Sequence, residues 1–114
     1  MVIHPDRMRA ETRENMRGGE GAVKLLHFIE AETVPHVKMA ANMTLEPGTG
    51  IGPHAHHTET EVFVFLEGSG VVNDDGTEVP VAKGDVMITG GGASHRVKNT
   101  GSSPLVFNAF IINN

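Results

Sequence analysis

The sequence contains no cysteine, no tryptophan and no tyrosine. The lack of cysteine excludes disulfide bonds and thiolate metal sites. The lack of indole and phenol groups means that neither can help to bind a ligand. The core must therefore be built from Val, Ile, Leu, Met and the 5 phenylalanines, and the 14 glycines indicate many tight turns between its elements.

Long apolar runs and basic clusters are also missing. No stretch approaches the length of a membrane span, and the first residues, MVIHPDRMRAETRENM, lack the apolar segment of a signal peptide. We therefore expect a cytoplasmic protein with no membrane partner. The net charge of -5, without a patch of Lys and Arg, argues against nucleic acid as a partner.

The 114 residues suit one compact domain. Residues 1–21 are predicted to form an N-terminal arm, because Met8, Ala10 and Met16 make no apolar stripe at helical spacing. Residues 22–114 are predicted to form the single domain.

Short strand signals separated by turn residues fill this domain. Val62 to Leu66 is apolar at every position, which predicts a strand buried on both faces. Asp75-Gly76 predicts a hairpin turn, and Pro80 indicates an edge strand. The other expected strands are 22–29, 37–45, 77–82, 86–89 and 104–112. This pattern, without a helical segment of any length, predicts an all-β sandwich or barrel.

Ligand-type side chains gather between Gly48 and Gly68, in GTGIGPHAHHTETEVFVFLEG. His54 and His56 point to one face of an extended chain. Glu61 lies at an odd offset from His56, so it can join them only if a bend or bulge within residues 57–60 resets the alternation. On an uninterrupted strand the set His57, Glu59 and Glu61 would share a face instead. Periodicity does not choose between the two sets.

A second stretch, from Gly84 to Asn99, places His95 after three glycines. Together the two stretches resemble the motifs of the cupin superfamily, G-x5-H-x-H-x3-4-E-x6-G and G-x5-P-x-G-x2-H-x3-N. Every fixed position matches except Gly90, where the family pattern has proline. Two motifs at the correct spacing are far more specific than either motif alone.

The resemblance implies a double-stranded β-helix, or jelly roll. It also implies that four residues bind one divalent metal ion inside the barrel: His54, His56, Glu61 and His95. A homodimer formed through the N-terminal arm and a sheet edge is implied as well. The RGGEG stretch over residues 17–21 is similar to the start of small single-domain cupins of the cupin 2 conserved-barrel type that carry an oxalate-decarboxylase-like label.

The chemistry of these residues agrees with the resemblance. Three neutral imidazoles and one carboxylate suit Mn, Fe, Co, Ni or Zn, and leave open positions for a small anionic ligand. Glu59 is the candidate catalytic proton-transfer group, since it is the one spare carboxylate near the site. Apolar residues expected in the core, and secondarily as pocket walls, are Met39, Met43, Phe63, Phe65, Met87 and Phe107.

Three functions are compatible with this site. The first is a metal-dependent enzyme that acts on a small carboxylate, dicarbonyl or sugar-derived acid by oxygenation, decarboxylation or isomerisation. Its weakness is the shortage of a base other than Glu59. The second is a non-catalytic module that binds or senses a small molecule through the metal. The third is a structural role, in which the ion only stabilises the fold.

Overall fold

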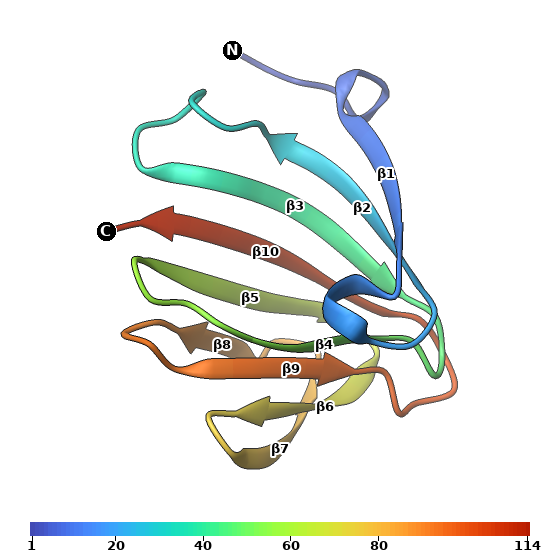
Figure 1. The fold of residues 1–114 in the computed structure, drawn as a ribbon. Coiled ribbons are helices and arrows are strands. Elements are labelled where there is room, and N and C mark those ends of the chain that lie inside the picture. The colour runs from blue at the N-terminus through green and yellow to red at the C-terminus, as the bar shows by residue number, and fades with distance from the viewer.

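The computed structural model describes residues 1–114 and contains two antiparallel β-sheets (Figure 1). The large sheet has the strand order β1-β2-β3-β10-β5-β8 and the small sheet the order β4-β9-β6-β7. The strands are β1 (Arg9–Glu14), β2 (Ala22–Ile29), β3 (Val37–Leu45), β4 (Gly50–Ala55), β5 (Glu59–Glu67), β6 (Ser69–Asp74), β7 (Thr77–Ala82), β8 (Val86–Thr89), β9 (Ser94–Lys98) and β10 (Leu105–Asn113). Two short 3-10 helices, η1 (Pro5–Arg7) and η2 (Met16–Gly18), flank β1. No helix has the length and apolar character needed to cross a membrane.

The core lies between the two sheets. Phe63, Phe65 and Phe107 of the large sheet pack in one cluster with residues of the small sheet, among them Val72 and Val97. In β2, β3, β5 and β10 the members of this cluster are alternate residues, as expected when only one face of a sheet is buried. The structure confirms the all-β prediction and the strands expected at 22–29, 37–45, 77–82 and 86–89.

The turn signals are also confirmed. The Asp75-Gly76 step joins β6 to β7 with both residues at positive φ, 47° and 100°. Pro80 lies in β7, which is an edge strand of the small sheet. An edge position suits proline because it has no N–H to donate to a neighbouring strand.

The N-terminal segment differs from expectation, because residues 9–14 of the predicted arm form the strand β1. This strand pairs antiparallel with β2 over its whole length, from Arg9 opposite His27 to Glu14 opposite Ala22. The sequence RAETRE carries no apolar alternation, so hydrophobic periodicity does not detect it. Its inward side chains are charged and face a buried histidine, which is why a polar strand is tolerated there.

The prediction that Val62 to Leu66 is buried on both faces is wrong for the outer face. Val62 and Val64 are only half-buried. Their cross-strand partners on β8, Ile88 and Val86, are 66% and 56% exposed. No second layer covers this side of the large sheet within the chain, and a run of five apolar residues does not reveal which face remains open.

Several loops meet at one end of the barrel. The Asn113 N–H donates to the His36 carbonyl at 2.6 Å, and the Gly92 N–H donates to the His56 carbonyl at 2.8 Å. The Asn114 N–H reaches the Thr58 carbonyl at 3.2 Å. The connections β2–β3, β4–β5 and β8–β9 and the C-terminus therefore surround the end of the barrel at which the histidines lie.

Candidate metal centre

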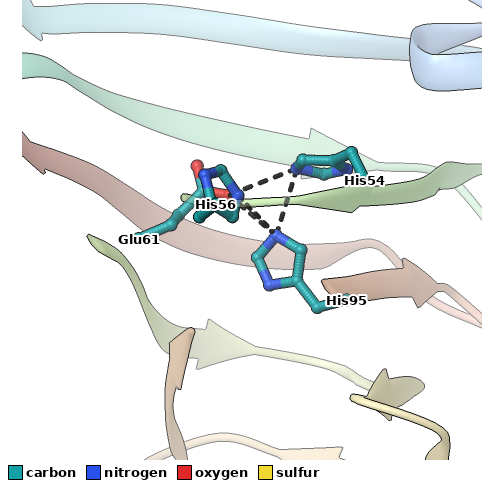
Figure 2. Close-up of side chains that lie close together, drawn as sticks. All are labelled: His54, His56, Glu61 and His95. Carbon is teal, nitrogen blue, oxygen red and sulfur yellow. Dashed lines mark hydrogen bonds and ion pairs between the residues drawn. The ribbon is translucent and has the colours of Figure 1, made fainter. Parts of the chain in front are cut away.

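Four ligand-type side chains from both sheets converge in the barrel (Figure 2). His54 on β4 and His95 on β9 are directly opposed in the small sheet. Glu61 comes from β5 in the large sheet, and His56 follows the end of β4. One ligand atom from each of the four residues lies within 4.8 Å of the others, and the group could hold a metal ion.

The bend expected within residues 57–60 is present and separates β4 from β5. His57 and Thr58 form a bend, and β5 begins at Glu59. Before the bend, the His56 N–H donates to the Ala93 carbonyl at 3.1 Å. His56 is thereby tied to the loop that precedes His95, and Glu61 turns inward on the next strand.

A backbone irregularity at Gly52 positions His54. The pairing of β4 with β9 shifts register between Ile51 and His54. Gly52 has no room for a side chain, since a Cβ there would lie 2.0 Å from the carbonyl oxygen of Arg17. The carbonyl of Gly52 in turn lies 2.9 Å from Nδ1 of His54.

Each of the three imidazoles has an oxygen atom beside its Nδ1. The partner of His54 is the Gly52 carbonyl, which can only accept a hydrogen bond, so Nδ1 of His54 carries the proton. The partner of His56 is Oε1 of Glu59 at 3.1 Å, and that of His95 is the Thr89 hydroxyl at 2.9 Å. With the proton on Nδ1, each Nε2 keeps a free lone pair, which is the form of histidine that binds metal.

The three Nε2 atoms face one another and Glu61. Nε2 of His95 lies 3.1 Å from that of His54 and 3.2 Å from that of His56. Oε1 of Glu61 lies 2.9 Å from His95 Nε2 and 3.0 Å from His56 Nε2. This oxygen is buried and has no hydrogen bond of good geometry. A buried carboxylate oxygen surrounded by nitrogen lone pairs calls for a cation, so these residues fit a divalent metal ion.

Electrostatics keep these groups in metal-binding form. Burial alone would raise the pKa of Glu61, but the imidazoles of His54 and His95 outweigh it and lower the pKa to about 2. Burial lowers the pKa of His95, which keeps the ring neutral. Glu61 is thus ionised and His95 uncharged near neutral pH.

The other predicted site residues lie around this group. His57 is exposed. Glu59 is near the site but contacts the far nitrogen of His56, and its second oxygen accepts a hydrogen bond from Lys38 at 2.9 Å. Phe63 stacks on His95 with ring centroids 4.9 Å apart. The other predicted pocket walls that lie in the buried core are Met43, Phe65, Met87 and Phe107. Met39 packs against that core and also lines a cavity.

Sequence reasoning missed the residues that orient the imidazoles. Thr89 lies opposite Glu61 across β5 and β8, and nothing in the spacing of its sequence marks it as a partner of His95. Gly52 acts through its carbonyl, which any residue possesses. Neither role has a local sequence pattern, because each depends on contacts between strands distant in the chain.

Comparison with known proteins agrees with this geometry. The cupin domain family matches residues 41–112. A curated protein of Thermotoga maritima, the oxalate-binding protein, is 40% identical over 113 residues, which cover 98% of this chain and 93% of the relative. A crystal structure from Thermotoga maritima, described as a predicted oxalate decarboxylase, has a TM-score of 0.95 and 39% identity, with each chain fully covered.

A more distant solved structure shares the fold. A Cupin 2 conserved barrel domain protein from Salinispora arenicola has a TM-score of 0.76 at 24% identity and covers 99% of this chain and 89% of its own. These comparisons confirm the double-stranded β-helix. The family match spans most of the barrel and includes all four converging residues. The chain therefore belongs to the cupin family.

Proposed function

We propose that this cupin binds one divalent transition metal ion through His54, His56, Glu61 and His95, and through that ion a small carboxylate such as oxalate. One observation carries the proposal: all three imidazoles have an oxygen partner at Nδ1, so that three Nε2 lone pairs and one unpartnered carboxylate oxygen face a common centre. Such an arrangement is suited to a cation rather than to protein–protein hydrogen bonds.

The residues around the centre have separate tasks in this proposal. When bound, the ion would supply positive charge and open coordination positions for an anion. Glu59, Thr89 and the Gly52 carbonyl hold the three rings in the correct tautomer and orientation. Phe63 fixes the plane of His95 and excludes water from behind it.

The choice of oxalate is supported by the relative from Thermotoga maritima that is named an oxalate-binding protein. The site itself also favours a small anion. Three neutral imidazoles and one carboxylate leave a divalent ion with a net charge near +1, which attracts a carboxylate ligand.

Binding is better supported than catalysis. Decarboxylation or isomerisation would need a side chain that can give or take a proton at the bound ligand. Glu59, the predicted catalytic residue, has one oxygen on His56 Nδ1 and the other on Lys38 Nζ. With both oxygens engaged, it serves to orient His56, so we assign it a positioning role.

A homodimer is also part of the proposal. Val86 and Ile88 of β8 are exposed, and with the half-buried Val62 and Val64 of β5 they form an apolar strip on the outer face of the large sheet. Such a strip is more stable when a second copy covers it. Analytical ultracentrifugation would show a species of twice the monomer mass. The cytoplasmic location stays a prediction from the sequence.

The proposal is tested by metal analysis and calorimetry. Protein purified without chelator is expected to contain close to one metal ion per chain and to bind oxalate only when loaded. His56→Ala should abolish both properties, whereas His4→Ala, at an exposed position in the N-terminal segment, should retain both. A loaded wild-type protein that binds neither oxalate nor any other small carboxylate would contradict the proposal.

A further inference from the structure

A cavity of about 350 Å³ beside the metal centre is lined by an unusual number of charged side chains. Its floor includes the apolar residues Ile111 and Met39. The charged residues of its wall are Arg9, Arg13, Arg17, Lys38, Glu30 and Glu59.

The cavity adjoins the four converging residues through the large sheet. Ile111 is the cross-strand partner of Glu61 on one side and of Met39 on the other. Directly paired residues in antiparallel strands project from the same face of a sheet. Glu61, Ile111 and Met39 therefore form one row that leads from the metal centre into the cavity. Glu59 is a second link, since it lines the cavity and contacts His56.

Arg17 is the one cation of this wall without a carboxylate partner. The other three are paired: Arg9 with Glu30 at 2.8 Å, Arg13 with Glu11 at 2.8 Å, and Lys38 with Glu59 at 2.9 Å. The guanidinium of Arg17 thus retains its full capacity to bind an anion at the cavity.

The backbone holds Arg17 in an unfavourable conformation next to the site. Its φ and ψ are 54° and 30°, a left-handed geometry that glycine adopts far more readily than arginine. Its carbonyl packs against Gly52, whose own carbonyl orients His54. Figure 1 shows η2, which contains Arg17, lying over β4. Backbone strain of this kind clusters at active sites and ligand-binding sites.

We propose that Arg17 forms an outer anion subsite of the metal centre, where its guanidinium binds the carboxylate oxygens of a short dicarboxylate that face away from the metal. This inference rests on the proposed function and names the class of ligand. A guanidinium donates two parallel hydrogen bonds to a carboxylate, which a lysine ammonium does not match.

The charges around the two sites suit a doubly charged ligand. In the wall of the cavity each cation except Arg17 is matched by a carboxylate, so Arg17 leaves one positive charge in surplus. The metal centre would contribute another, from a divalent ion and the single carboxylate of Glu61. Two positive charges at neighbouring sites favour a dianion such as oxalate or malonate over a monocarboxylate.

The test is calorimetric titration of metal-loaded protein with oxalate, malonate and acetate. Arg17→Gln is expected to lower the affinity for oxalate and malonate at least 10-fold. It should change the affinity for acetate and the uptake of metal by less than about twofold. Arg17→Lys should recover part of the dicarboxylate affinity. Arg7→Gln serves as the matched control, since Arg7 is exposed in η1 and lines no cavity.

Each outcome is decisive. Dicarboxylate affinity that is unchanged in Arg17→Gln, or that falls equally in Arg7→Gln, would overturn the subsite while leaving the metal-dependent function intact. A parallel loss of metal uptake in Arg17→Gln would also overturn it, because Arg17 would then only support the fold near Gly52. Wild-type protein that takes up no metal, or binds no carboxylate when loaded, would instead overturn the proposed function.

Discussion

Oε1 of Glu59 lies 3.1 Å from Nδ1 of His56, on the side of the ring away from the other converging residues. The second oxygen of Glu59 binds Lys38. Lys38 lies on β3 of the large sheet, whereas His56 follows β4 of the small sheet. The contacts from His56 through Glu59 to Lys38 therefore tie a histidine of the centre to the opposite wall of the barrel. Burial would raise the pKa of Glu59, but Lys38 and His56 together lower it, so the carboxylate stays ionised and fixes the tautomer of His56.

Replacement of Glu59 by glutamine should therefore weaken metal binding. The loss of the charge beside Nδ1 makes the His56 ring a poorer ligand, and partners of this kind typically change metal affinity 10- to 100-fold, so we expect a loss of roughly 10-fold. Competition titration against a metal-sensitive dye measures the change. Glu67→Gln is the matched control, an exposed glutamate on the same strand. Equal affinities in the two variants would refute the orienting role.

Thr89→Val tests the partner of His95. The two side chains have nearly the same shape, but valine leaves the buried Nδ1–H of His95 without an acceptor. An unsatisfied buried donor costs about 1–3 kcal/mol, and we expect metal-free protein to lose stability in this range. Urea denaturation measures it. Thr12→Val, at an exposed position of β1, is the control, and a loss no larger than in that variant would show that the contact does not matter.

The residue types of the candidate site could be predicted from sequence, but its supporting contacts could not. The spacing of His54, His56 and Glu61 is local, and parity shows that only a bend can bring them together, although parity alone leaves His57, Glu59 and Glu61 open as an alternative set. The contact between Thr89 and His95, and that of Gly52 with Arg17, join strands whose pairing the sequence does not display. Sequence reasoning identified the atoms suited to a metal but not those that set their tautomers.

The strand β1 shows that the fold, too, depends on contacts that have no local sequence pattern. Strand signals come from apolar alternation, and β1 alternates Arg, Glu and Arg toward the barrel. Its inward residues are stabilised by ion pairs, chiefly that of Glu11 with Arg13 and the contact of Glu11 with buried His27. Charge complementarity between residues far apart in the chain has no periodic pattern, so the sequence predicts an N-terminal arm here and not a strand.

Asn99 should be essential for stability. Its fully buried amide donates to the carbonyls of Leu45 and Ser103, both at 2.8 Å, and accepts from the Gly101 N–H at 2.9 Å. Asn99→Ala leaves these backbone groups unsatisfied at about 1–3 kcal/mol each, so we expect a total loss of at least about 3 kcal/mol. Thermal unfolding should show a Tm lower by more than about 10 °C. Ser102→Ala, in the same loop and exposed, should leave Tm within a few degrees of the wild type.

Glu11 should make stability depend on acid pH. The Arg13 guanidinium, and after it His27, lower the pKa of Glu11 to about 2. The unfolded chain takes up the proton near the ordinary glutamate pKa of 4.5, whereas the folded state does so only near a pKa of about 2. Between these pH values the unfolded state binds more protons, so stability is lost as pH falls from about 4.5 toward about 2.

Glu11→Gln removes this contribution, and its urea midpoint should fall less steeply than that of the wild type between pH 5 and pH 3. Glu61 has a similarly low pKa, so the urea midpoint of both Glu11→Gln and the wild type still falls in part as the pH is lowered. Glu14→Gln is the control, since Glu14 is exposed and has no ion pair. If Glu11→Gln and Glu14→Gln show the same slope as the wild type, the ion pairs of Glu11 do not contribute to acid sensitivity.

Metal removal should destabilise the protein strongly. A ligand that binds only the folded state contributes about 4 kcal/mol at a concentration 1,000 times its Kd, which corresponds to a Tm shift of about 15 °C or more. Scanning calorimetry with excess metal and with chelator at pH 7.5 measures the shift. Because histidine must be neutral to bind, the shift should disappear well below about pH 6, where protons compete for Nε2.

The variant His54→Ala separates the metal from the fold. In the loaded protein it removes a ligand, and Tm should fall. In the chelated protein it removes a nitrogen lone pair that lies 3.1 Å from that of His95, which is itself 3.2 Å from that of His56, so Tm should stay the same or rise. This reversal is expected only if the centre is arranged for a cation. A fall in Tm of equal size with and without metal would show that His54 stabilises the barrel by packing alone.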